Sequence, residues 1–408
     1  RPLVCLISPL AGMGINNENT LLLFRHHILK KEERRLSLSE IFSHGVAYAL
    51  DTKIFEEKFS ERVGSKFAIS CSSGTSALHL CFMSINLKKN DVVILPVINF
   101  IASINMSHIM GARIFFADVD KKTGQMTPKT LEKCIKINKI NKIKAVVTMY
   151  NGGNPNNARE FFKIKKKYKF ILIEDACHSL GGKYAISKNL KVGSCKFSDL
   201  TTFSLHPVKS ITTGEGGMIT TNDKKLQKKI LILRNHGILR KKNEKKKYNW
   251  KYKIIYPGYN YRLSDIACSL GLTQLSQLSK FIKKRLNIFN LYKNTLKNFS
   301  NFLYLPESFK DQLSANHLFI IIFKKNKLKI SRDEIIQKLF KKRVLTQVHY
   351  IPVYKHPYYK KICKGIFPGA SFYFSNCLSL PIYPELKRKE INYVCECLKK
   401  ILIETEKK

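Results

Sequence analysis

The sequence predicts an α/β fold, with a large domain on a mainly parallel, doubly wound sheet and a smaller α+β domain toward the C-terminus. Apolar runs typical of strands alternate with segments of helical spacing through the first half of the chain, and such alternation indicates a parallel sheet. The chain of 408 residues has room for two domains and an ample core. We expect a divergent N-terminal segment at 1–50, a large domain at 51–285 and a small domain at 286–408.

The individual elements follow from the spacing of apolar residues. A helix is expected around residues 55–63, and strands are expected at 67–71, 92–95, 113–117, 145–149 and 170–173. A long helix should run from Ser264 to about Asn294 and lead into the small domain, which should hold a strand at 317–323 and a helix at 333–342. We find no internal repeat and no low-complexity linker between these elements.

Composition and cysteine usage indicate a soluble protein of a reducing compartment. The hydrophobic content is 44% and the charged content 25%, as in soluble globular proteins. The eleven cysteines are scattered and form no C-x-x-C pair, and Cys395 and Cys397 are too close for a normal zinc pair. Residues 3–15 are apolar like the core of a signal peptide, but this run is too short for a membrane helix and only Arg1 precedes it. We therefore expect a cytoplasmic protein with no metal site and no membrane partner.

The formal net charge of +44 allows two interpretations. Seventy-three Lys and Arg residues against 29 Asp and Glu could indicate nucleic-acid binding. However, the lysines are spread along the chain with abundant Ile and Asn, as expected from an AT-rich genome, and no nucleic-acid module is recognisable. The segment 240–253 combines basic residues with Tyr248, Trp250 and Tyr252 and could contact a nucleotide, but a solvated loop is favoured. We expect no specific nucleic-acid partner.

Residues 170–217 contain the pattern that points to chemistry. The apolar run 170–173 leads into Asp175, and Lys209 lies in a turn followed by the glycine-rich string 212–217. An acid at the end of a buried strand faces the usual ligand edge of an open α/β sheet. Such a carboxylate can keep a pyridine nitrogen protonated, and partial burial beside another cation can lower the pKa of a lysine. The alternative is a loop-capping acid and a solvated lysine. Together, Asp175 and Lys209 favour a pyridoxal 5′-phosphate site in which the lysine holds the cofactor and the acid pairs with its ring nitrogen.

A second candidate element is the small-residue turn at residues 72–76, which opens a predicted helix. The N-terminus of a helix offers unpaired N–H groups and a positive dipole end to an anion. Gly74 permits close approach of the backbone, and Thr75 adds a hydroxyl group. An ordinary serine N-cap is the alternative. Beside Asp175 and Lys209, the turn is interpreted as the binding site for the cofactor phosphate.

The strings His206–Lys209 and Ile211–Gly217 resemble the DegT/StrS family of sugar-nucleotide aminotransferases, and the similarity extends from about Phe55 to the C-terminal region. The resemblance implies the aspartate aminotransferase fold (fold type I), pyridoxal 5′-phosphate as cofactor, and a homodimer with shared active sites. Within the family, these strings are most similar to members of pseudaminic (nonulosonic) acid biosynthesis. The activity then implied is transfer of an amino group, from L-glutamate, to the 4-keto group of a UDP-linked 4-keto-6-deoxy-N-acetylhexosamine.

The resemblance also implies roles for residues that no local pattern identifies. The aromatic ring of Phe100 would stack on the pyridine ring, although core packing is its plain alternative. His178 would contact the ring hydroxyl and Ser204 the phosphate, whereas Asn260 would reach the phosphate held by the partner subunit. His349 and Tyr350 fall in the segment that contacts the sugar nucleotide. The family's substrate-contacting pattern is not matched in the first 50 residues.

Three alternative functions compete with this one. A sugar dehydratase on the same fold would have histidine in place of Lys209, so the intact lysine argues against it. Another sugar-nucleotide aminotransferase, acting on a different sugar or position, stays open. A basic nucleic-acid-binding protein on an enzyme-like scaffold is disfavoured, because both Asp175 and Lys209 are present.

Overall fold

We describe the protein from a computed structural model, which covers residues 50–240, 250–307 and 312–407. Its largest sheet has seven strands in the order β1-β9-β8-β5-β4-β2-β3. The strands are β1 (Phe67–Cys71), β2 (Val92–Pro96), β3 (Arg113–Ala117), β4 (Ala145–Met149), β5 (Ile171–Asp175), β8 (Leu200–Ser204) and β9 (Gly217–Thr221). The pairs among β2, β3, β4, β5 and β8 are parallel, whereas β9 runs antiparallel to both β1 and β8. The predicted mainly parallel sheet is confirmed.

Helices cover both faces of this sheet. Side chains at alternate strand positions therefore pack into hydrophobic clusters on opposite faces. Ile173 packs in the cluster that includes side chains of α3, α4 and α7, whereas Leu172 packs with side chains of α5 and α6. The helices are α2 (Leu50–Val63), α3 (Gly74–Ser84), α4 (Ala102–Ile109), α5 (Pro128–Ile137), α6 (Ala158–Tyr168) and α7 (Lys224–Leu233). This arrangement is the predicted double winding.

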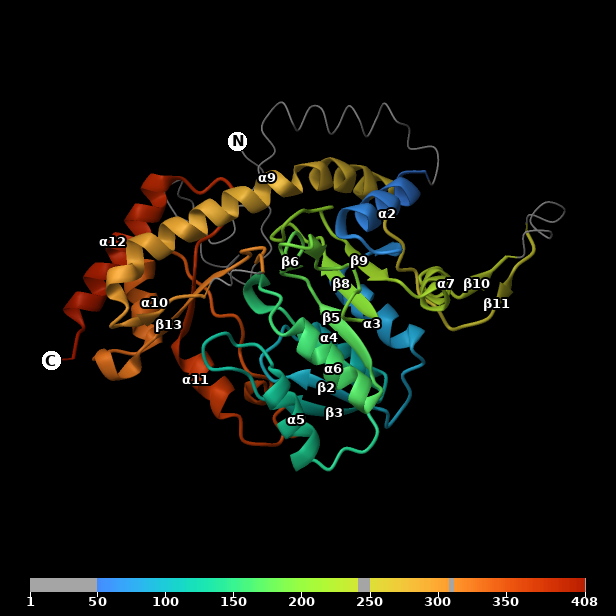
Figure 1. The fold of residues 1–408 in the computed structure, drawn as a ribbon, viewed down its shortest axis with the longest axis horizontal. Helices are drawn as coiled ribbons and strands as arrows, with labels where there is room; N and C mark the ends of the chain where they lie inside the picture. The colour runs from blue at the N-terminus through green and yellow to red at the C-terminus, as the bar shows by residue number, and fades with distance from the viewer. Residues whose placement is uncertain (1–49, 241–249, 308–311, 408) are drawn as a thin grey trace.

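The long helix α9 (Asp265–Leu296) extends along one side of the molecule from α2 to α12 (Figure 1). Beyond it lies a three-stranded antiparallel sheet, ordered β12-β13-β14, with its own buried cluster. The elements here are β12 (Leu303–Tyr304), β13 (Phe319–Phe323), β14 (Cys377–Leu380), α10 (Arg332–Lys341), α11 (Pro368–Asn376) and α12 (Arg388–Glu404). The division into domains at residues 50 and 285 stays a prediction.

Short elements complete the described chain. Two small hairpins are β6 (Lys183–Ala185) with β7 (Leu190–Lys191), and β10 (Ile238–Leu239) with β11 (Lys253–Ile254). Figure 1 shows the second hairpin projecting from the body of the molecule. The 3₁₀ turns are η2 (Asn151–Gly153), η3 (Lys297–Phe299), η4 (Lys325–Lys327) and η5 (Val353–Lys355). Most of the basic segment 240–253 lies outside the described residues, as do residues 1–49.

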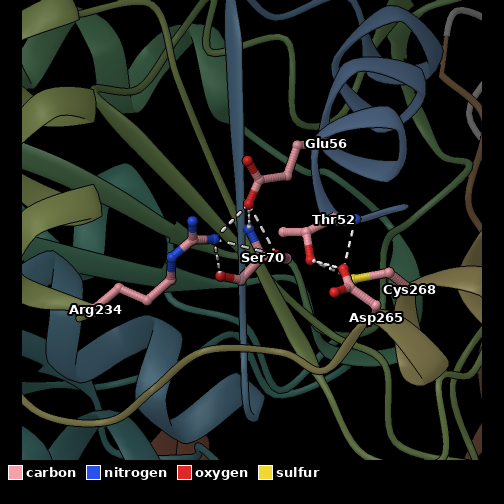
Figure 2. A network of polar contacts seen from close by, with 6 residues as sticks. All are labelled: Thr52, Glu56, Ser70, Arg234, Asp265 and Cys268. Atoms are coloured by element: carbon pink, nitrogen blue, oxygen red, sulfur yellow. Dashed lines mark hydrogen bonds and ion pairs between the residues drawn. The ribbon is translucent and has the colours of Figure 1, made fainter. Parts of the chain in front are cut away.

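A network of polar side chains fixes α2 to β1 and α9 (Figure 2). The Glu56 carboxylate of α2 accepts hydrogen bonds from the backbone N–H and the hydroxyl of Ser70, each at 2.8 Å, and pairs with the Arg234 guanidinium. At the start of α2, the hydroxyl of Thr52 donates to Asp265 at 2.6 Å. Because Ser70 lies in β1, this network holds the strand that precedes the Gly74 turn.

Two observations bear on compartment and membranes. The ten cysteines within the described ranges are all free thiols. No helix in the portion of the chain that the structure describes is both long and apolar enough to cross a membrane.

Candidate active site

The carboxyl ends of the parallel strands bring most of the predicted site residues to one edge of the seven-stranded sheet. β5 ends at Asp175 and β8 at Ser204. At the same edge, β1 leads into the turn before Gly74, and β2 leads toward Phe100. β9 begins here, since Gly217 pairs with the last residues of β1 and β8. Open α/β sheets bind ligands at this edge.

Asp175 is a buried carboxylate, 4% exposed, at this edge. Its Oδ1 accepts a hydrogen bond from the backbone N–H of Cys177 at 3.2 Å. Burial raises the pKa of Asp175, and the positive charge of Lys209 lowers it in part. No ion pair of the described residues includes Asp175. Its carboxylate is therefore suited to a cationic group of a ligand.

Lys209 lies in the tight turn after β8, where its N–H donates to the carbonyl of His206 at 2.9 Å. The turn is closed by Leu205, whose N–H donates to Gly216 and whose carbonyl accepts from Thr213. Burial lowers the pKa of Lys209, opposed in part by the charges of Cys177 and Asp175. The predicted lowering of the Lys209 pKa by burial is confirmed, but no neighbouring cation of the described residues contributes to it. Burial is the main cause of the lowered pKa, whereas the charges of Cys177 and Asp175 raise it.

The turn before α3 and the end of β8 form a narrow cradle. Ser73 caps α3, because its hydroxyl accepts the N–H of Ser76 at 3.0 Å. The N–H groups of Gly74 and Thr75 have no hydrogen bond within the described chain, so they are available to an anion. A Cβ atom at Gly74 would lie 2.9 Å from the Cβ of Ser204. Only glycine leaves this cradle open, and the serine N-cap therefore does not prevent the turn from receiving an anion.

His178 and Tyr350 meet beside Asp175. The Nε2 atom of His178 lies 3.0 Å from the Tyr350 hydroxyl, and its Nδ1 accepts the N–H of Gly152 at 3.4 Å. Burial lowers the pKa of His178, and the charge of Lys209 lowers it further. Burial also raises the pKa of Tyr350, as does the charge of Asp175. Tyr350 thus lies at the core of the candidate site.

His349 and Phe100 are two further predicted site residues near Tyr350. The ring of His349 is buried and its Nδ1 lies 2.9 Å from the hydroxyl of Ser379 in β14. The ring of Phe100 is 53% exposed, which rules out plain core packing, and its centroid is 5.8 Å from that of Tyr350. Phe100 therefore presents an open aromatic face next to the site.

Asn260 lies on the strand-like segment before α9. Tyr259 and Tyr261 stack on each other at 5.1 Å and both lie against His79 of α3. Because side chains alternate along an extended segment, Asn260 faces away from α3, and it is exposed. No hydrogen bond or ring contact among the described residues joins it to His178 or Asp175. Within this chain, Asn260 lies outside the cluster.

Sequence reasoning missed His317, which enters from the segment before β13. Its ring centroid is 4.3 Å from that of His178, and its side chain is buried. A histidine at the start of a predicted strand carries no local signal of this contact, because it depends on how the two sheets meet.

The residues present fit pyridoxal 5′-phosphate. The cradle at Gly74 is open because it has no Cβ atom there, and no ion pair of the described residues holds the buried Asp175 carboxylate. Lys209 has a lowered pKa, as a lysine that forms a covalent bond to an aldehyde requires.

Comparisons with known proteins agree with this fit. The model of the DegT/DnrJ/EryC1/StrS aminotransferase family matches residues 30–399. A UDP-4-amino-4,6-dideoxy-N-acetyl-beta-L-altrosamine transaminase of Campylobacter jejuni is 36% identical over 356 residues, covering 86% of this chain and 90% of the relative. Helicobacter pylori PseC, an aminotransferase involved in the biosynthesis of pseudoaminic acid, is 27% identical with a TM-score of 0.84, covering 94% and 100%. The PLP form of a putative sugar aminotransferase of Streptococcus pneumoniae is 25% identical with a TM-score of 0.80, covering 91% and 96%.

The fold and the site define a pyridoxal phosphate-dependent aminotransferase that acts on sugar nucleotides. The chain belongs to the DegT/DnrJ/EryC1/StrS aminotransferase family. The predicted resemblance, fold class, cofactor and type of enzyme are confirmed.

Proposed function

We propose that this enzyme transfers an amino group from L-glutamate to the 4-keto group of a UDP-linked 4-keto-6-deoxy-N-acetylhexosamine, in pseudaminic acid biosynthesis. The observation that carries the proposal is the presence of the buried Asp175 and Lys209 together at the ligand edge of the sheet, in a chain of this family. The finer choice of sugar is supported by the named relatives that share 36% and 27% identity with the chain.

The proposed roles divide the chemistry among residues of this chain. When bound, pyridoxal phosphate supplies an electron sink for the carbanion formed at the substrate. Asp175 holds the proton on the ring nitrogen, and Lys209 first holds the cofactor and then, as a free amine, moves a proton at the substrate carbon. The lowered pKa of Lys209 favours its neutral, proton-accepting form.

The remaining residues bind and orient. Gly74, Thr75 and Ser204 would hold the phosphate at the cradle, and Phe100 would cover the ring. His178 would contact the ring hydroxyl, Asn260 would come from the partner of a homodimer, and His349 and Tyr350 would contact the sugar nucleotide. We further propose a cytoplasmic location and no specific nucleic-acid partner. A DNA mobility-shift assay at rising salt tests the last point.

The cofactor role of Lys209 predicts a yellow protein with a visible absorbance band that borohydride abolishes. Lys209→Ala should bind pyridoxal phosphate only non-covalently and lose turnover. The matched control is Lys183→Ala, in the β6–β7 hairpin, which should keep both colour and activity. A wild-type protein that stays colourless with added cofactor would contradict the assignment.

The substrate is tested by mixing the protein with L-glutamate and a panel of UDP- and other nucleotide-linked keto-sugars, and following product mass. We expect a product slightly heavier than the keto-sugar, because an amino group and a hydrogen replace the oxo oxygen at C4 while L-glutamate becomes its 2-oxo acid. The UDP-linked 4-keto-6-deoxy-N-acetylhexosamine should be the preferred acceptor. Preferred amination of a 3-keto sugar, or of a sugar on another nucleotide, would favour the alternative aminotransferase.

A further inference from the structure

Two buried histidines, His178 and His317, have their rings in contact at the candidate site. Their ring centroids are 4.3 Å apart and their planes are inclined by 35°. His178 follows β5 of the seven-stranded sheet, whereas His317 precedes β13 of the three-stranded sheet. The pair therefore joins the two sheets next to Asp175.

Gly152 fixes both histidines through its backbone. Its N–H donates to Nδ1 of His178 at 3.4 Å, and its carbonyl accepts the N–H of His317 at 3.0 Å. Its φ of +77° lies in the left-handed region that favours glycine. Because Nδ1 of His178 accepts a hydrogen bond, the neutral ring carries its proton on Nε2. That Nε2 is the atom 3.0 Å from the Tyr350 hydroxyl.

The surroundings keep both rings neutral. Burial lowers the pKa of His178 and of His317, and nearby positive charges lower them further. The charged and titratable groups around the pair are Lys209, Arg285, His349, Tyr350, Cys177 and Asp175. Nδ1 of His317 has no hydrogen-bond partner within the described ranges. A buried, unpaired ring nitrogen is costly, and an apolar side chain would fill this space without that cost. The structure therefore gives the His317 side chain a role through the contact of its ring with His178 rather than through its Nδ1 atom.

We propose that His317 is a positioning residue, whose ring holds His178 in the orientation that presents Nε2–H to the cofactor. This inference rests on the proposed role of His178 at the ring hydroxyl. It also assigns a task to the segment 315–318, since its backbone bonds to Gly152 and Gly153 place the ring of His317.

The test uses the holoenzyme and the pH midpoint at which its visible absorbance band changes. A hydrogen bond donated to the ring oxygen stabilises the deprotonated oxygen and keeps this midpoint low. His317→Leu removes the stacked ring, so the midpoint should rise by about half to one pH unit, the size of one hydrogen bond. His317→Phe retains a stacking ring and should stay close to wild type. His178→Phe removes the donor and should show the largest rise.

Phe319→Leu is the matched control, because Phe319 is two residues from His317 and is buried in the hydrophobic cluster of the three-stranded sheet. It should lower thermal stability without moving the midpoint. His317→Met provides a second ringless variant and should behave like His317→Leu. An unchanged midpoint in the folded ringless variants, alongside a shift in His178→Phe, would overturn the inference and leave the proposed function standing. A colourless wild type would instead overturn the cofactor assignment, and an unshifted His178→Phe the proposed role of His178.

Discussion

At the scale of single residues, two adjacent carboxylates show how environment assigns roles. Asp175 faces the ligand edge with one backbone hydrogen bond. Glu174, its neighbour, points to the other side of β5 and is fully surrounded by hydroxyl donors. These donors are Tyr150, Tyr184, Ser198 and Thr201. Glu174 is therefore satisfied within the protein, and Asp175 is the acid left for a ligand.

Asp175→Asn tests this assignment. A neutral amide fits the same space, so the variant should fold and still bind the cofactor covalently. Turnover should fall by about 100-fold or more, because an amide cannot hold the protonated ring nitrogen. Absorbance spectra and steady-state kinetics measure the two properties separately. Near-wild-type turnover would mean that Asp175 is not the partner of that nitrogen.

Buried histidines predict a pH dependence of stability. Burial lowers the pKa of His349 from its usual 6.5 to about 3. Below pH 6.5 the unfolded chain binds a proton that the folded chain refuses until about pH 3, so stability is lost as the pH falls through this window. His349→Gln should remove about 2 kcal/mol of the loss between pH 6.5 and 5. Urea unfolding of the wild type and of His349→Gln at each pH measures the free energy of unfolding of each protein. If both lose the same free energy between pH 6.5 and 5, the lowered pKa of His349 is contradicted.

At the scale of elements, the sequence predicted most of the structure that local patterns control. The strands at 67–71, 113–117 and 145–149 have the predicted bounds. The strand expected at 317–323 begins two residues later, because the N–H groups of His317 and Leu318 bond to the Gly152 carbonyl instead of to a neighbouring strand. The antiparallel position of β9 between β1 and β8 could not be predicted, since it depends on pairing between distant segments.

The attachment of α2 to β1 yields a prediction about stability. Glu56 and Arg234 form a pair with side chains only 16% and 13% exposed. Glu56→Gln leaves the guanidinium without a counter-charge and should lower the free energy of unfolding by about 3 kcal/mol. Glu61→Gln in the same helix breaks an exposed pair with Lys58 and should cost less than about 1 kcal/mol. Urea denaturation compares the two variants, and equal losses would show that the Glu56 pair contributes no more than a surface contact.

At the scale of the whole molecule, the single subunit leaves Asn260 outside the cluster of Asp175, His178 and Lys209. Its exposure and its direction away from α3 support the proposed homodimer, in which each site draws on both chains. The site residues near Lys209 could be predicted because they follow strands of one sheet. The approach of the two sheets at His178 and His317 could not, since no spacing within one segment encodes it.

Mixed dimers test the shared site. Lys209→Ala and Asn260→Ala should each be poorly active alone. In a mixed dimer, one site collects both defects and the other has an intact Lys209 and an intact Asn260. With free exchange, about half of the dimers are mixed and about a quarter of all sites are whole, by two-fold symmetry. Activity should therefore return on mixing. If mass analysis shows mixed dimers but no activity returns, Asn260 serves its own chain.

The pairing of β1 with β9 also sets an order of events during synthesis. Residues 67–71 leave the ribosome early, yet their hydrogen-bonding partners are residues 217–221. At roughly 5 to 20 residues per second, β1 waits about 7 to 30 seconds for that partner. The Gly74 turn and Ser204 can enclose an anion only once β9 lies between their strands. The nascent chain therefore gains its phosphate cradle only after Lys209 has emerged, about half way along the 408 residues, and cofactor capture cannot begin before that point.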